Sequence, residues 1–180
     1  MNYHKLKPGM LAAERTTTHI GHAIRATLGC VTNHNKTLTY MDGRWYWHEA
    51  IPYKSVLTPV ETIDPRVTML RIYDLPDLTE EDRLMINFAS LRLVGTPYPT
   101  KHSLSMLALY RVVNNIPFKL PMLPLESKWC TQLMWDILFD GLGRDPLPDT
   151  DGESKANPTP RTFENRVIAG LVKDVTEEVV

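Results

Sequence analysis

The clearest hydrophobic period in the chain begins at residue 130. Apolar side chains recur there at the three- and four-residue spacings that put them on one face of an α-helix: Cys130, Leu133, Met134, Ile137 and Leu138. Ser127, just before this run, is a suitable N-cap residue. The pattern therefore predicts a helix whose first turn carries Cys130 on the buried side.

A β-hairpin is predicted for segments 31–40 and 45–51, the second of which is rich in strand-favouring aromatic residues. The turn between them contains Asp42-Gly43, a dipeptide typical of two-residue hairpin loops. With these two residues as the loop, Met41 faces Arg44. Each step back along the first strand then pairs with one step forward along the second. Lys36 is then opposite Glu49.

The same register brings a histidine and a carboxylate together. His34 is predicted opposite Ile51, which makes it a diagonal neighbour of Glu49 on one face of the hairpin, with backbones roughly 7 to 8 Å apart. Two long side chains can meet across that distance. A slip of one residue would place them on opposite faces.

The rest of the pattern predicts strands and helices in alternation. Thr79 and Asp82 have the spacing of a capping box and predict a helix whose buried side carries Leu84, Phe88 and Leu91. The other predicted elements are strands at 10–13 and 66–73, a helix at 19–28, a largely apolar helix at 102–114 and a proline-rich loop at 116–125.

Length and composition predict one domain. The chain has 180 residues, 43% of them hydrophobic, which is enough for a substantial core without disulfide bonds. We expect a single domain over 1–180 with its core at about 8–142, a long surface loop at 144–161 and a C-terminal helix at 162–175 whose acidic end frays.

Charge and hydropathy narrow the choice of partners. Lys plus Arg number 20 against 21 Asp plus Glu, and they are interspersed, which argues against nucleic acid or an anionic membrane as a partner recognised by bulk charge. No stretch approaches the roughly 18 to 20 apolar residues of a membrane span, and the N-terminus lacks the apolar run of a signal peptide. We expect a cytoplasmic protein or, if the gene is viral, one in the host cytoplasm or the virion.

The two cysteines are expected to be free thiols with different roles. Cys130, in a first helical turn, feels the positive end of the helix dipole, which favours thiolate, and the unpaired N–H groups there can hold an oxyanion. Such a thiol needs an imidazole and a group to orient it, and His34 with Glu49 is a candidate pair. Ordinary packing is the alternative for Cys130, and Cys30, after a helix end, is expected to be structural.

A series of short motifs then resembles a known family. Pro8-Gly9 precedes a short strand and a helix, and is followed in order by "NH" at 33–34, "HEA" at 48–50, "GTPY" at 95–98 and "WCTQL" at 129–133. In order, spacing and setting these are similar to the circularly permuted papain-fold hydrolases, the YiiX and YaeF-like relatives of NlpC-type cell-wall peptidases. The resemblance covers roughly Pro8 to Leu142.

This resemblance implies an α+β fold in which an antiparallel sheet or small barrel packs against helices. It implies a Cys130 nucleophile, a His34 base and a Glu49 orienting carboxylate, with Tyr98 near the substrate and no cofactor or metal. The implied activity is a cysteine peptidase or amidase, or an acyl ester or thioester hydrolase, working through an acyl-enzyme. The implied substrates are a peptide, a peptidoglycan fragment or an acylated small molecule.

Lys36 departs from the family pattern, which has small apolar residues after the histidine, and could compete with His34 for Glu49. One alternative is therefore a non-catalytic binding or structural module, for example a phage or host-interaction protein that keeps the fold. A second is a metal-dependent enzyme using His19 and His22, although no acidic residue follows them at the spacing of the zincin motif.

Overall fold

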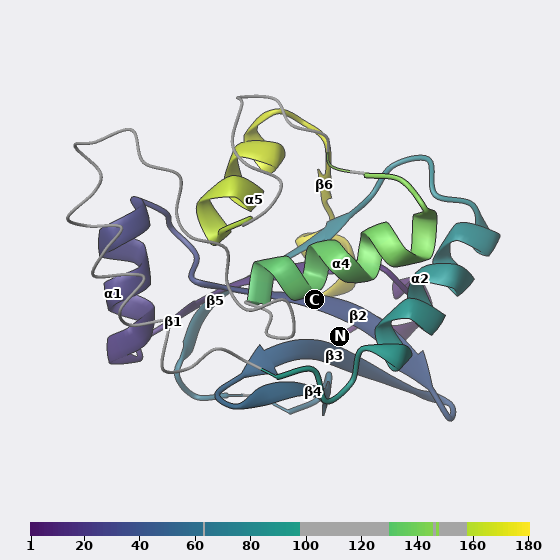
Figure 1. Cartoon of the computed structure of the whole chain (residues 1–180), viewed down its shortest axis with the longest axis horizontal. Coiled ribbons are helices and arrows are strands. Elements are labelled where there is room, and N and C mark those ends of the chain that lie inside the picture. Colours follow the sequence, from purple (N-terminus) through teal and green to yellow (C-terminus); the bar gives the residue numbers. More distant parts are fainter. Residues whose placement is uncertain (63, 98–129, 146, 148–157) are drawn as a thin grey trace.

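The sheet is the centre of the structure, a computed structural model that describes residues 1–62, 64–97, 130–145, 147 and 158–180 (Figure 1). In these residues six antiparallel strands lie in the order β4-β3-β2-β1-β5-β6. The strands are β1 Leu11–Thr16, β2 His34–Met41, β3 Arg44–Ile51, β4 Lys54–Pro59, β5 Val67–Asp74 and β6 Lys173–Asp174. The helices are η1 Tyr3–Lys5, α1 His19–Leu28, α2 Glu80–Arg92, α4 Cys130–Leu142, α5 Pro160–Ile168 and α6 Thr176–Val179.

The predicted hairpin register is confirmed. Every pair from Lys36 with Glu49 to Met41 with Arg44 is the one that the predicted register requires. Asp42 and Gly43 both have positive φ, 50° and 78°, as a two-residue hairpin turn requires. Local turn chemistry was therefore sufficient to fix which face of β2 and β3 each side chain occupies.

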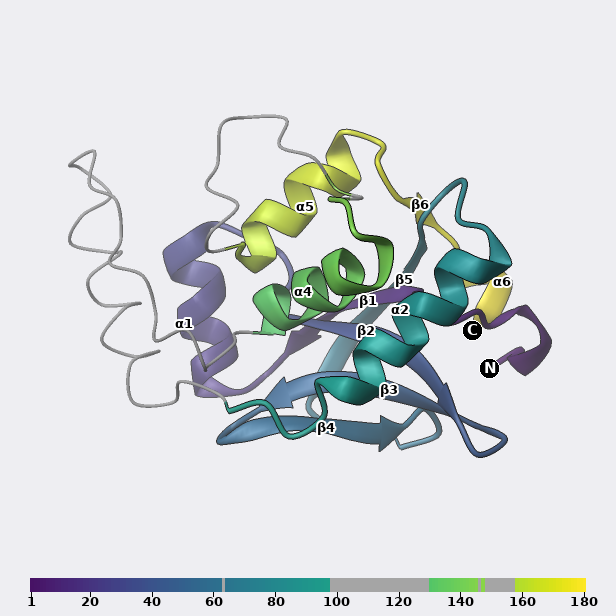
Figure 2. The same ribbon diagram turned by 45° about the vertical axis from the view of Figure 1, so that its right-hand side comes forward.

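The sheet buries apolar side chains on both faces. On one face, residues of β1, β3 and β5 pack against α2, α4 and α5, which lie over the sheet in Figure 2. On the other face, alternate residues of β1, β2, β3 and β5 pack with residues near the two chain ends. Cys130 and the four apolar residues predicted to share its helical face are all buried, as expected.

The buried side of α2 differs from the prediction. The capping box of Thr79 and Asp82 is present, but Leu84 and Phe88 are 52% and 56% exposed. The buried residues of α2 are mostly polar: Arg83, Ile86, Asn87, Ala89 and Ser90.

Each buried polar side chain of α2 has a partner on the sheet. Asn87 exchanges two hydrogen bonds with the backbone of Tyr40. Ser90 contacts Thr39 and His48 through its hydroxyl. A hydrophobic pattern cannot predict this face, because bonds to distant strands offset the cost of burying these groups.

Helices α2 and α4 are in close contact at Gly141. A Cβ atom there would lie 2.6 Å from the Cα atom of Ile86 and 2.7 Å from its backbone nitrogen. Only a glycine lets the two backbones approach this closely.

The C-terminal part is also different from the prediction. The helix predicted at 162–175 is α5, which ends at Ile168, and it is followed by β6 and α6. The end does not fray, because Val175 and Val179 are buried and the carbonyl of Val179 accepts a hydrogen bond from the N–H of Asn2. Strand β4 was not predicted.

Several predictions lie outside the described residues. These are the helix at 102–114, the loop at 116–125, the N-cap Ser127, Tyr98 and most of the loop at 144–161.

Candidate active site

Four ionisable side chains share one face of the sheet at the start of β2. Glu14 of β1 is the direct cross-strand partner of His34, and Lys36 is the partner of Glu49 on β3. Because side chains alternate along a strand, His34 and Lys36 point to the same face. Glu14, Lys36 and Glu49 are buried, and His34 is largely so.

The contact predicted between His34 and Glu49 is present. Nε2 of His34 lies 2.9 Å from Oε2 of Glu49. Thr58 of β4 lies near the Glu49 carboxylate and, after His34 and Lys36, helps to lower its pKa against burial. The carboxylate is thus held on one side by the imidazole and on another by a neighbouring strand.

Cys130 is the first residue of α4 and reaches the same place from the helical layer. Its sulfur lies within interaction range of the His34 ring and of the backbone N–H of Asn35, both of which lower the pKa of the thiol against the opposing effect of burial. Since Nε2 of His34 is engaged by Glu49, Nδ1 is the ring atom left to face the sulfur. Thr131 anchors this helix start by donating a 2.8 Å hydrogen bond to Oδ1 of Asn35.

The electrostatics favour an ion pair between the thiol and the imidazole. Burial alone would raise the pKa of Cys130, but the hydrogen bond and charge of His34 outweigh it and lower that pKa. Burial likewise opposes charging His34, yet Cys130 and Glu49 raise the pKa of His34 to about 10. The pKa of Glu49 falls to about 2, because His34 and Lys36 outweigh its burial.

Lys36 contacts Glu49, as the sequence suggested, but it contacts Glu14 more closely. Its Nζ lies 2.8 Å from Oε1 of Glu14 and 3.2 Å from Oε2 of Glu49. Sequence reasoning missed Glu14. A lone carboxylate within the buried strand Leu11–Thr16 was the available signal, because such a charge needs a partner.

The loop that leads into His34 is fixed at two points. The Asn33 N–H donates to the Glu14 carbonyl, and the Asn33 side chain accepts from the Thr16 N–H. A single oxygen of Glu164 on α5 accepts three hydrogen bonds, from both backbone N–H groups of Val31 and Thr32 and from the Thr32 hydroxyl.

Glu164→Ala is expected to lower the free energy of unfolding by about 2 kcal/mol, because it removes the acceptor of these three hydrogen bonds. It is also expected to slow alkylation of Cys130, since the loop before His34 is no longer held. Urea unfolding and thiol labelling measure the two effects. Glu61→Ala, at an exposed carboxylate, is the control and should stay within about 0.5 kcal/mol of wild type. An equal response from both variants would contradict the role of Glu164.

Two further candidate groups lie apart from this cluster. Cys30 is buried, and burial together with the charge of Glu164 raises its pKa to about 12, so it is held as a thiol. His48 faces the helical layer, where it contacts Ser90, and burial lowers its pKa to about 4.

The described residues contain no group of three or more His, Cys, Asp or Glu side chains arranged to hold a metal ion. His22, considered in the sequence as part of a pair with His19, contacts the Arg25 guanidinium through Nδ1. The Lys36 ammonium beside Glu49 makes that carboxylate a poor place for a second cation.

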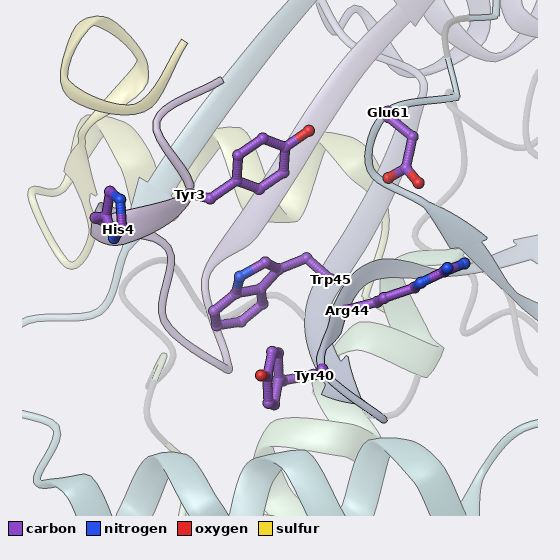
Figure 3. Close-up of a pocket in the computed structure, with 7 residues that line it drawn as sticks. Tyr3, His4, Tyr40, Arg44, Trp45 and Glu61 are labelled. Atoms are coloured by element: carbon purple, nitrogen blue, oxygen red, sulfur yellow. The ribbon is translucent and has the colours of Figure 1, made fainter.

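A separate pocket of about 600 Å³ lies at the other end of β2, beside the hairpin turn (Figure 3). It is lined by Tyr3, His4, Tyr40, Gly43, Arg44, Trp45 and Glu61. None of the residues around Cys130 contributes to it, so it is distinct from the candidate active site.

None of the helices in the described residues is long and apolar enough to cross a membrane.

Comparisons with known proteins identify a shared fold. No family model matches the sequence, and no curated protein matches it. Among solved structures, the chain is similar to the metalloprotein YiiX from Escherichia coli O157:H7, with a TM-score of 0.62 and 13% sequence identity over 88% of this chain and 79% of that one. The chain therefore has a YiiX-like, papain-like α+β fold, as the sequence predicted.

Proposed function

We propose that the chain is a cysteine hydrolase of the permuted NlpC type. The observation that carries this proposal is the convergence of a helix-start thiol, an imidazole and a carboxylate from three separate segments, with Cys130 and Glu49 both in contact with His34. The lowered pKa of Cys130 and the raised pKa of His34 support a thiolate–imidazolium pair at neutral pH.

In the proposed reaction the Cys130 thiolate attacks a carbonyl carbon and forms a carbon–sulfur bond. N–H groups at the start of α4 hold the oxyanion of the tetrahedral intermediate. The intermediate collapses to an acyl-enzyme as His34 gives its proton to the leaving amine, alcohol or thiolate. His34 then takes a proton from water, which attacks the acyl-enzyme, releases the carboxylic acid and restores the thiol. Glu49 keeps the imidazole oriented throughout.

The substrates proposed are an amide in a peptide or peptidoglycan fragment, or an ester or thioester of an acylated small molecule. These share the electrophilic carbonyl that the thiolate requires. The reaction as written needs no cofactor.

The test is alkylation by iodoacetamide as a function of pH, with each cysteine followed by mass spectrometry. At neutral pH Cys130 is expected to react more than about a hundredfold faster than Cys30, because one pKa is lowered and the other is raised. The rate at Cys130 should fall only when the pH drops below its lowered pKa. Cys30 serves as an internal control in the same molecule.

His34→Ala should move the acid limb of the Cys130 profile to higher pH. The variant removes the hydrogen bond and charge that lower the thiol pKa, while the burial that raises it remains. Two results would contradict the hydrolase and favour a non-catalytic binding module. One is slow labelling of Cys130 in the wild type, and the other is a Cys130 pH profile that is the same in His34→Ala as in the wild type.

A further inference from the structure

The acidic and basic side chains beside His34 form a chain of alternating charge. It runs from Glu14 to Lys36 to Glu49 to His34, and the contacts are 2.8 Å, 3.2 Å and 2.9 Å. Glu14, Lys36 and Glu49 are only 6%, 7% and 8% exposed. Charges buried to this degree are stable only when each is compensated by a neighbour.

The main ion-pair partner of Lys36 is Glu14. The Lys36 ammonium is closer to Glu14 than to Glu49, and Glu14 is the larger of the two influences that raise its pKa against the opposing effect of burial. Both Lys36 and His34 approach the same oxygen of Glu49, Oε2. A lysine without its own carboxylate would therefore compete with the imidazole for that oxygen.

We propose that Glu14 is a positioning residue for the catalytic group: by pairing with Lys36 it keeps that ammonium from competing with His34 for the Glu49 carboxylate. This inference rests on the proposed function, which it deepens. It also accounts for the polar residue after the histidine, since Lys36 and Glu14 act as a pair.

Other charged groups near this chain are few among the described residues. Cys130 faces His34 from α4. The charge of Lys36 interacts with the Asp64 carboxylate. The charge of Glu49 interacts with His48, which lies on the opposite face of β3. Burial lowers the pKa of His48 to about 4, so it is neutral at neutral pH.

The test is Glu14→Gln, which keeps the shape of the side chain and removes its charge. Lys36 then has Glu49 as its remaining close carboxylate, so the His34 imidazolium is less stable and the pKa of Cys130 rises. The acid limb of Cys130 alkylation should move up by about one pH unit, which means about tenfold slower labelling on that limb. The pKa of the His34 ring, followed by NMR, should fall.

The double variant Glu14→Gln with Lys36→Met is the matched control. It removes both charges together, so His34 no longer has a competitor for Glu49. The acid limb of Cys130 alkylation should therefore return to within about 0.3 pH unit of wild type, the scatter of independent effects. Recovery on removing a second buried side chain is not expected of residues that only fill space.

Two results would overturn the inference. The first is a Glu14→Gln profile and His34 pKa equal to those of wild type, and the second is a double variant shifted as far as the single one. Failure of the proposed function looks different, because wild-type Cys130 would then label slowly or independently of His34. The His34 pKa measured by NMR decides the positioning role in either case.

Discussion

Cys130→Ala is expected to abolish hydrolysis of activated acyl esters by this chain, with a loss of about 10⁴-fold or more in kcat/KM. The substitution removes the sulfur that contacts the His34 ring and leaves a small apolar residue that fits the buried start of α4. The measurement is release of nitrophenol from esters with short and long acyl chains, together with release of the amine from acylated amino-acid anilides.

Cys30→Ala is the matched control for this result. Cys30 is also buried, but it lies beside Glu164 rather than His34, so its loss should leave the rate unchanged. Full activity in Cys130→Ala would end the proposed mechanism. Activity that survives this change but disappears with a chelator would instead favour a metal-dependent enzyme.

Gly141→Ala is expected to destabilise the fold by about 3 kcal/mol, the upper range for overpacking. The new Cβ would meet backbone atoms of Ile86 at 2.6 and 2.7 Å, and backbone cannot move aside as a side chain can. Helix propensity predicts the opposite sign, because alanine is about 1 kcal/mol better than glycine within a helix. Urea unfolding therefore separates the two effects by the direction of the change.

Gly143→Ala is the control for Gly141→Ala. Gly143 has φ of 63°, but a Cβ there meets no atom within 4 Å, so only backbone strain of about 1 to 2 kcal/mol is expected. A Gly141→Ala protein as stable as wild type would mean that α2 and α4 can separate without cost.

Elements set by local chemistry could be predicted from the sequence. The Asp42-Gly43 turn fixed the hairpin register and hence placed His34 within reach of Glu49. Thr18 and Gly29 bound α1 at the predicted residues, one as the N-cap and the other in the left-handed conformation that ends the helix. The buried face of α4, which begins with Cys130, also followed from its apolar period.

Features set by distant contacts could not be predicted in this way. Glu14 enters the site only because β1 pairs with β2, and nothing near it in sequence indicates that pairing. The polar buried side of α2 depends on partners on the strands, such as Tyr40 for Asn87, 47 residues away. After Ile168, pairing of β6 with β5 replaces the predicted helix.

The two chain ends lie together, far from His34. The Asn2 N–H donates to the Val179 carbonyl at 2.7 Å, and Figure 2 shows both termini on one side of the molecule. Tyr3 and Tyr40 line the same pocket, and Tyr40 lies six positions after His34 along β2, a span of roughly 20 Å. An affinity tag or sensor-chip tether at either terminus would therefore sit by the hairpin turn and leave the His34 end directed toward the solution.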